Sequence, residues 1–314
     1  MRAAALLRSA GAERVLWYNL KDHPGQACYG LVRGGESDAL YDSLKPSAAA
    51  FRVLSSQIAN REPLGSQDFM PHVIAATFDD VGDWGPPFQA TAEPMQSTTA
   101  QVYRGTGAAR IAYRFGQPDN EYVAFPYHGA RFLPTDTSRI GLWVYGDGSG
   151  HILHLRLRDA AGEVLQYRLG FIGATGWHFL STSITGAVEE GNRIVPGNGQ
   201  LDGTLQIREL VIDDHPDGAT GTGAIYVDEL TVFQGPEVYA ERFAVGSSAT
   251  EGVVDLIWAL APTTITLSTA AANVTMTSRD GSATSLEADD GQVMIAVGPA
   301  PVYVRHVPTP GGHG

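Results

Sequence analysis

Nine short β-type runs between residues 75 and 235 constrain the fold of this chain more than any other feature. Gly, Asp, Asn or Pro interrupts the runs at regular intervals, and these residues favour turns. Such spacing is typical of an antiparallel β-sandwich or jelly roll, so we predict a jelly roll over residues 75–235. The nine runs are AATFDDVGDW, AARIAYRFG, EYVAFPY, RIGLWVYGDG, HILHLRLRD, EVLQYRLGFI, WHFLSTSITG, LQIRELVIDD and GAIYVDELTVF.

Three of these runs alternate between apolar and polar or aromatic residues. In a strand, successive side chains point to opposite faces, so the apolar set of each run is expected in the core. Ile140, Leu142 and Val144 oppose Trp143 and Tyr145; Leu153, Leu155 and Leu157 oppose His154, Arg156 and Arg158; Leu165, Tyr167 and Leu169 oppose Gln166 and Arg168.

The last part of the chain repeats the β pattern. Residues 236–306 contain VYAERFAV, GVVDLIWALA, TTITLST, NVTMTSRDG, QVMIAVG and PVYVRHV, which predict a second, smaller β-sandwich. SRDGS and ADDGQ are good hairpin turns. Residues 307–314, rich in Pro and Gly, are expected to form a flexible tail.

The first 60 residues have a different pattern. Residues 3–10 favour a helix that Gly11 should end, and residues 14–20 are a short apolar run of the kind buried in a parallel sheet. A second helix is expected from Lys45-Pro46 to about residue 57. The order helix–strand–loop–helix predicts the closing portion of a repeating β/α fold.

Charge and cysteine usage exclude several function classes. The net charge is −13 with no basic stripe, so nucleic acid is not an expected partner. The single Cys28 allows no internal disulfide and no cysteine metal site, and is expected to be a small buried residue. No segment is long and apolar enough to span a membrane, and the first residues lack the form of a signal peptide.

ERVLWYNLKD, YGLVR and LKPSAAAFRVL make the N-terminal 60 residues resemble the end of the catalytic barrel of clan A glycoside hydrolases, especially the xylosidase/iduronidase-like group. The resemblance implies a short α/β remnant of a TIM barrel. In that family both catalytic glutamates lie on earlier strands, which correspond to positions before Met1. Asp22 and His23 would follow the last strand as loop residues. The expectation is therefore a chain that is not itself an enzyme.

FDDVGDW, YRGTGAARI and GAIYVDELTV resemble a galactose-binding-like carbohydrate-binding jelly roll. In such modules a structural calcium often joins the first strand to the last. The resemblance implies Asp79 or Asp80 and Asp228 as ligands, with backbone carbonyls near Arg104 and Ala108. VDLIWALAP and VTMTSRDG resemble the small β-domain that follows the barrel in the same hydrolases. That domain is expected to take a strand from residues 57–70, which makes the jelly roll an insertion.

The non-core face of the three alternating runs is a candidate glycan platform. Sugars lie with their CH faces on aromatic rings, and their hydroxyls bond to forked donors. Alternatively, another domain covers this face, or Trp143 packs beneath a loop. The candidate carbohydrate-binding residues are Trp143, Tyr145, His154, Arg156, Gln166 and Arg168.

Three functions follow as hypotheses. The first is a non-catalytic, carbohydrate-binding accessory region of a glycoside hydrolase, with polysaccharide as partner and calcium stiffening the fold. The second is a structural protein that assembles with copies of itself, because an incomplete barrel would leave strand edges and helix faces to be covered. The third is one part of a split hydrolase that a partner chain completes. The resemblance implies an extracellular or cell-surface location.

Overall fold

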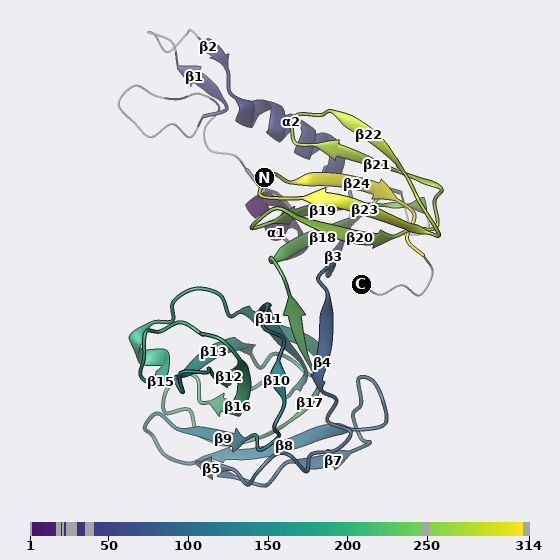
Figure 1. Cartoon of the computed structure of the whole chain (residues 1–314). Coiled ribbons are helices and arrows are strands. Elements are labelled where there is room, and N and C mark those ends of the chain that lie inside the picture. The colour runs from purple at the N-terminus through teal and green to yellow at the C-terminus, as the bar shows by residue number, and fades with distance from the viewer. Residues whose placement is uncertain are drawn as a thin grey trace. The chain divides into compact units, whose positions relative to one another are not determined.

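The computed structural model describes residues 2–16, 20, 22, 30–34, 41–246 and 251–309. The chain divides into two compact units (Figure 1). The jelly-roll unit comprises Pro71–Gly235, and the split unit comprises Met1–Met70 together with Pro236–Gly314.

Two seven-stranded sheets build the jelly-roll unit, and the pairings between their strands are antiparallel. The β12 sheet has the order β15-β13-β12-β16-β9-β5, with β10 beside β16. The β11 sheet has the order β14-β11-β17-β8-β6, with β4 beside β17 and β7 beside β8. The strands of the β12 sheet are β5 (Phe88–Gln89), β9 (Tyr122–Pro126), β10 (Phe132–Leu133), β12 (Ile152–Arg158), β13 (Val164–Phe171), β15 (Arg193–Val195) and β16 (Leu205–Asp213). Those of the β11 sheet are β4 (His72–Ala76), β6 (Thr91–Ala92), β7 (Gln96–Thr98), β8 (Ala108–Phe115), β11 (Thr137–Gly146), β14 (Gly176–Ser183) and β17 (Gly221–Gln234); a short 3-10 helix, η1 (Glu190–Asn192), precedes β15.

One hydrophobic core fills the jelly-roll unit, and the predicted alternation is confirmed. The apolar sets of β11, β12 and β13 all belong to this core. Leu142, Leu155 and Leu165 have no exposed surface, whereas their strand neighbours Trp143 and Gln166 are partly exposed. Burial of each of these three leucine side chains stabilises the unit by roughly 1.5–3 kcal/mol.

The first of the nine runs is mostly not a strand. Only Ala75 and Ala76 of AATFDDVGDW lie in β4. The carboxylate of Asp80 accepts a hydrogen bond from the backbone N–H of Gly82, and this local turn replaces ladder pairing.

The split unit contains a six-stranded sheet of order β22-β21-β24-β19-β18-β3 and a two-stranded sheet of β20 and β23. Its β-strands after the insertion are β18 (Val238–Ala244), β19 (Val253–Ala259), β20 (Thr263–Ser268), β21 (Asn273–Ser278), β22 (Ala283–Glu287), β23 (Gln292–Val297) and β24 (Val302–His306). Its elements before the insertion are α1 (Arg2–Ser9), β1 (Val32–Gly34), β2 (Tyr41–Leu44), α2 (Pro46–Ile58) and β3 (Pro63–Gln67).

Segments from both ends of the chain share the six-stranded sheet. β3 lies within residues 57–70, from which a strand was expected, and it pairs antiparallel with β18. The jelly-roll unit therefore interrupts the split unit in sequence, between Met70 and Pro236.

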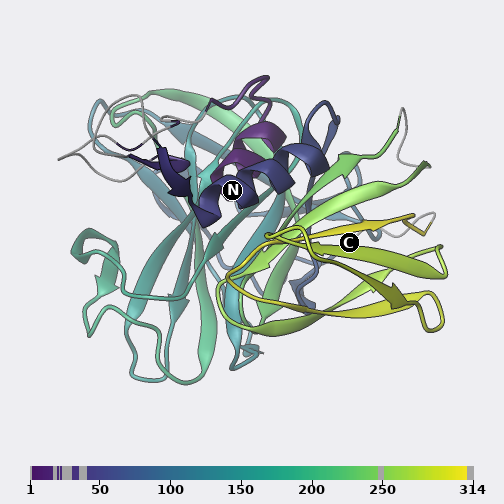
Figure 2. The same cartoon turned by 90° about the horizontal axis from the view of Figure 1, so that it is seen from above.

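The two helices pack on this sheet. Ala5 of α1 and Leu54 of α2 join a core with Phe243 and Tyr303, and Figure 2 shows both helices beside the C-terminal strands of the same unit. Both helices agree with the sequence expectation, since Pro46 opens α2 and Gly11, with φ +92°, follows α1.

The structure gives no support to a barrel remnant in residues 1–60. Within the described residues, the strands of this segment are β1 and β2, and they pair antiparallel, whereas barrel strands are parallel. Arg14–Leu16 are not in a strand, and residues 17–19, Cys28 and His23 lie outside the described residues. The buried residues of both helices pack in the core of the split unit, so these helix faces do not supply the uncovered surface from which self-assembly was expected.

In the described part of the chain, no helix is both long and apolar enough to span a membrane. Val307–Thr309 of the predicted tail have no regular secondary structure, and residues 310–314 lie outside the described residues.

Candidate functional site

The six candidate carbohydrate-binding residues do not share one face. Trp143 and Tyr145 lie on β11, while the other four lie on β12 and β13 in the opposite sheet. All six alternate with core residues, so the two groups point away from the core on opposite sides of the sandwich. The molecule thus has two separate candidate faces, the β12 face and the β11 face.

The β12 face is the outward face of the β12 sheet, and the strand register arranges its side chains in four rows. Polar and charged groups occupy the middle of the face, and aromatic residues stand at several row ends. From β13 across β12 and β16, the rows are Phe171, Ile152, Asp213 and Tyr122; Arg168, His154, Val211, Ala124 and Phe88; Gln166, Arg156, Glu209 and Pro126; and Val164, Arg158, Gln206 and Phe132.

Three side-chain contacts hold Arg156 in the middle of this face. Its Nε donates to Oε1 of Gln166 at 2.8 Å, and its Nη1 donates to Oε2 of Glu209 at 2.7 Å. The guanidinium also lies over the ring of Tyr122, 5.0 Å from the centroid. Contacts from three strands fix this side chain, which is 7% exposed, in one geometry.

His154, beside Arg156 on β12, is buried without hydrogen-bonding partners. Its side chain is 7% exposed, and neither ring nitrogen forms a hydrogen bond. Nε2 lies 3.3 Å from Oδ2 of Asp213, which is an ion pair when the ring is protonated. Buried polar groups are usually satisfied, and both nitrogens of this ring are closed to solvent, so His154 is an unsatisfied group beneath the surface of the face.

The aromatic rim of the β12 face was missed by sequence reasoning. Phe88, Phe132 and Phe171 are 39%, 59% and 46% exposed, and Tyr122 is partly exposed. Phe88 and Phe132 lie in two-residue strands, which show no periodicity to detect. Phe171 follows a register irregularity in the β12–β13 pairing, so simple alternation does not carry through to it.

The β11 face carries a continuous aromatic cluster. Its rings pack mainly against one another: Trp143 contacts Phe179 at 5.3 Å between centroids, and Tyr145 contacts Trp177 at 5.7 Å. The remaining members are Tyr226, Phe233 and Tyr103. The ring of Tyr103, which lies in a loop, stacks on Trp143. Trp143 therefore packs beneath a loop, which was one of the alternatives to a glycan platform in the sequence analysis.

Two of the predicted metal ligands hold the loop that carries Tyr103. Oδ2 of Asp228 accepts the backbone N–H groups of Tyr103 and Arg104, at 3.0 and 3.1 Å. Oδ1 of Asp79 accepts those of Thr106 and Gly107, both at 2.7 Å. Asp80 turns instead to Gly82, as described above.

Asp79 and Asp228 form a small acidic cluster whose negative charge suits a cation. Two acidic side chains do not complete a metal site. Burial, reinforced by Asp79, raises the pKa of Asp228; burial and Asp228 also raise the pKa of Glu229. The N–H donors on Asp79, by contrast, lower its pKa. Across the described residues, no group of three His, Cys, Asp or Glu side chains could hold a metal ion. Calcium binding therefore stays a prediction.

Asp22, which follows the apolar run in the N-terminal segment, is engaged structurally. Its carboxylate accepts hydrogen bonds from Lys45 Nζ and from the backbone N–H of Gly30, both at 2.7 Å. The Lys45 ammonium is the main cause that lowers the pKa of Asp22. This pair joins Asp22 to the residue that precedes α2.

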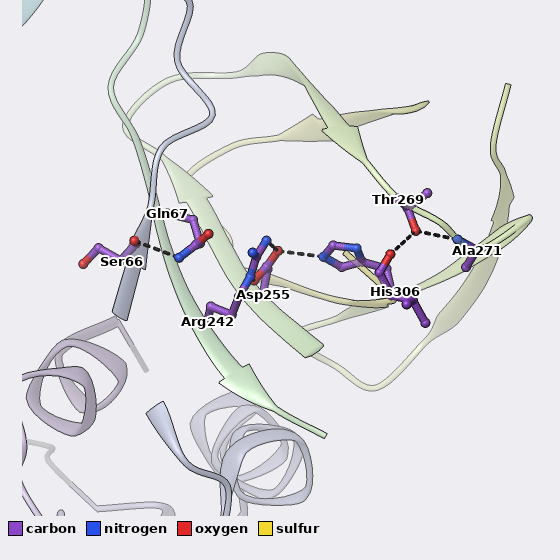
Figure 3. A network of polar contacts seen from close by, with 8 residues as sticks. Ser66, Gln67, Arg242, Asp255, Thr269, Ala271 and His306 are labelled. Atoms are coloured by element: carbon purple, nitrogen blue, oxygen red, sulfur yellow. Dashed lines mark hydrogen bonds and ion pairs between the residues drawn. The ribbon is translucent and has the colours of Figure 1, made fainter. Parts of the chain in front are cut away.

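A buried charge cluster lies in the split unit (Figure 3). Arg242 forms a bidentate pair with Asp255, at 2.7 and 2.8 Å, and His306 Nε2 lies 2.9 Å from Oδ2 of the same carboxylate. Asp255 and the side chain of His306 have no exposed surface. The cluster joins β18, β19 and β24 and is closed to any substrate, so its role is structural.

Comparison with known proteins gives a partial family match. Residues 135–238 match the family model described as flagellar filament outer layer protein FlaA. The match covers roughly a third of the chain, mainly β11–β17. Comparison with curated proteins found no match.

Among solved structures, the chain is similar to several carbohydrate-binding modules. The family 11 module of a cellulosomal cellulase of Clostridium thermocellum is 13% identical, with a TM-score of 0.37, over 54% of this chain and 97% of that module. The C-terminal family 22 module of Xyn10B of Clostridium thermocellum is 15% identical, with a TM-score of 0.32, over 52% and 94%. TmCBM61, solved with β-1,4-galactotriose, is 13% identical, with a TM-score of 0.32, over 51% and 94%. Such low scores carry no functional argument.

Proposed function

We propose that the chain is a non-catalytic carbohydrate-binding protein whose β12 face holds a polysaccharide. The observation that carries this proposal is the fixed guanidinium of Arg156, held by Gln166, Glu209 and Tyr122 amid a rim of exposed aromatic rings. Rigid forked donors and flat apolar rings on one sheet face suit sugar recognition, and the rings of this face are exposed around a middle that is largely buried.

Each part of this face suits one part of a sugar. The rings of Phe88, Phe132 and Phe171 offer apolar surfaces for CH faces, and they already stand exposed. The exposed Arg158 and Arg168 offer donors for hydroxyl groups, while Arg156 and His154, each 6% exposed, order the middle of the face. Because the polar side chains are already ordered, binding costs little side-chain entropy.

Three finer points belong to the same proposal. The chain serves a glycoside hydrolase as an accessory region, it works outside the cell, and calcium near Asp79 and Asp228 stiffens the fold without touching the sugar. Burial, and after it the charge of nearby Asp79, raises the pKa of Asp228, and the closeness of these two carboxylates supports the calcium.

Affinity electrophoresis and calorimetry on the intact chain test the proposal, with xylan, mixed-linkage glucan, galactan and polygalacturonate as probes. We expect retardation by at least one of them. The double variant Phe88→Ala/Phe171→Ala should abolish the retardation while it leaves the fold intact, because both rings are already exposed.

Tyr226→Ala is the matched control, since Tyr226 is a partly exposed aromatic residue of the β11 face. It should bind like the wild type. Loss of binding in Tyr226→Ala but not in the double variant would move the site to the β11 face, and failure of every probe would overturn the proposal.

A second candidate function is self-assembly into an extracellular layer. One observation favours it: residues 135–238 match a family described as a flagellar filament outer layer protein. This segment contains β11, β14 and β17, the strands that carry most of the aromatic cluster on the β11 face. Partly exposed aromatic rings are enriched in protein interfaces.

Light scattering at increasing protein concentration, followed by electron microscopy, tests the second function. Assembly predicts a mass that grows with concentration and ordered polymers on grids. A mass that stays at 33.4 kDa across the range would contradict it.

A further inference from the structure

The β12 face is locally basic on an acidic protein. Four arginines, Arg156, Arg158, Arg168 and Arg208, face two carboxylates, Glu209 and Asp213, while the whole chain has a net charge of −13. Arg208 belongs to this face because Nε lies 3.8 Å from Oε1 of Glu209. The sign of this patch is thus opposite to that of the rest of the molecule.

Each carboxylate of the face has a basic side chain at short range, and the one beside Asp213 is a histidine that pairs with it only when protonated. Glu209 pairs with the buried Arg156 at 2.7 Å, and Asp213 lies 3.3 Å from His154. Glu209 also lies 3.8 Å from Arg208, so of the three outer arginines, Arg158, Arg168 and Arg208, Arg208 already has a carboxylate of this face beside it.

The three outer arginines are exposed to solvent. Within the described residues, neither Arg158 nor Arg168 forms an ion pair, and Arg168 lies over the ring of Phe171, 5.5 Å from its centroid. An arginine stacked on an aromatic ring keeps its in-plane N–H groups available for an anion.

The arginines are too far apart to serve one small anion. Arg168 on β13 lies opposite His154 on β12, and Arg158 lies four residues after His154 on β12. At about 3.3 Å per residue, their attachment points are about 13 Å apart along the sheet. Charges at this separation match a polymer that carries anionic groups on separate residues.

We infer that the β12 face takes an acidic polysaccharide, one with carboxylate or sulfate groups on a sugar backbone. The inference rests on the proposed function, and it names the ligand class for that site. Arg158, Arg168 and Arg208 pair with the anionic groups, because guanidinium binds carboxylate and sulfate through two parallel hydrogen bonds. The aromatic rim contacts the sugar rings.

A pair of polymers that differ in charge alone provides the test. Polygalacturonate and its fully methyl-esterified form share one backbone, and esterification removes the carboxylate charge. We expect the intact chain to bind polygalacturonate, to lose that binding on esterification, and to bind more weakly as sodium chloride rises from about 0.05 to about 0.5 M. Carrageenan, a sulfated galactan, distinguishes sulfate from carboxylate as the recognised group.

Substitutions of single arginines test where the acidic polymer binds. Arg158→Gln and Arg168→Gln should each weaken binding by about fivefold, since each removes one exposed charge contact. Arg114→Gln, an exposed arginine on β8 of the other sheet, is the matched control and should bind like the wild type. Monomeric galacturonate should not compete at concentrations that match the polymer's sugar content.

The outcomes separate this inference from the proposed function. Binding of neutral xylan or galactan at the β12 face, with no preference for polygalacturonate or carrageenan over neutral polymers, overturns the inference and leaves the function standing. Equal loss in Arg114→Gln and Arg168→Gln overturns the location. Failure of all polysaccharides, neutral and acidic, overturns both.

Discussion

The ring of Tyr103 stacks on the indole of Trp143, with centroids 3.8 Å apart and planes inclined by 18°. Tyr103 belongs to a loop rather than a strand, and Asp228 holds that loop through two backbone N–H groups. Trp143 is on the outward face of its sheet, yet one of its ring faces is already occupied. This contact leaves less of Trp143 for a sugar to stack on and so adds to the reasons for placing the proposed sugar site on the β12 face.

Tyr103→Ala should destabilise the jelly-roll unit by about 1 kcal/mol beyond the effect of the lost buried area, because a stacked aromatic pair contributes about that much. Trp143 should become accessible, which increases quenching of tryptophan fluorescence by iodide. Tyr103→Phe keeps the ring and is the control. Unchanged quenching in Tyr103→Ala would show that the stack does not form in solution.

Asp228→Asn should loosen the same loop. The carboxylate accepts N–H groups from Tyr103, Arg104 and Glu229, and an amide cannot accept all three. We expect a loss of about 1–3 kcal/mol in the free energy of unfolding, measured by urea titration. Asp217→Asn, an exposed acid of the same unit, should have no effect.

Calcium binding is tested on the same residues. If the ion joins Asp79 and Asp228, calcium should raise the melting temperature of the jelly-roll unit relative to EDTA, and Asp228→Asn should abolish the rise. The pKa of Asp228 is raised, chiefly by burial, so protons should displace calcium as the pH falls through that raised value. Identical melting curves in calcium and EDTA would contradict the prediction.

The inside and outside of each strand could be predicted from the sequence, but not which sheet a strand joins. Leu142 and Leu155 were both expected in the core, and both are there. The same period of two describes β11 and β12, and nothing local shows that the chain crosses from one sheet to the other between Gly146 and Ile152. This is why Trp143 and Arg156 were expected on one face.

The barrel expectation failed for a related reason. Helix 46–58 and the proline at its start were predicted correctly. The sequence of an amphipathic helix shows that one side is apolar, but it does not show which element covers that side. Here strands from the other end of the chain cover Leu54. Local sequence patterns cannot predict contacts between segments so far apart in the chain.

Asp255 should make the split unit sensitive to acid. Burial raises its pKa, but hydrogen bonds from Arg242 and His306 outweigh burial, so the net pKa is lowered. A lowered pKa in the folded state contributes stability that is complete above the unfolded value of about 3.9. That stability is lost as the pH falls below this value through the folded pKa.

The split unit should therefore unfold more easily below about pH 4. Asp255→Asn should cost about 3–5 kcal/mol at neutral pH, because it leaves Arg242 buried without its counter-ion, and it should flatten the acid dependence. Calorimetry between pH 3 and pH 7 measures both effects, with the exposed Asp289→Asn as control. An equal acid dependence in the variant and the wild type would assign the sensitivity to other groups.

Gly141 is required by the packing on the β11 face rather than by backbone conformation. A Cβ at this position would lie 2.3 Å from the Phe179 ring and 2.9 Å from Ser181 Cβ. Phe179 cannot easily move aside, because Trp143 and Phe233 pack against it at 5.3 and 6.0 Å between centroids. Gly141→Ala should thus destabilise the jelly-roll unit by about 1–3 kcal/mol through overpacking.

A double-mutant cycle separates this overpacking from a simple effect of the substitution on the strand. In the background of Phe179→Ala, which removes the ring, Gly141→Ala should cost much less, and the coupling energy between the two sites should be about 1 kcal/mol or more. Gly148→Ala is not a suitable control, since its φ of +79° adds backbone strain, whereas Gly116→Ala meets open space without a left-handed φ and should be near neutral. Additive costs at Gly141 and Phe179 would mean that the ring does not lie over the glycine, and the aromatic cluster would then have to be arranged differently around Trp143.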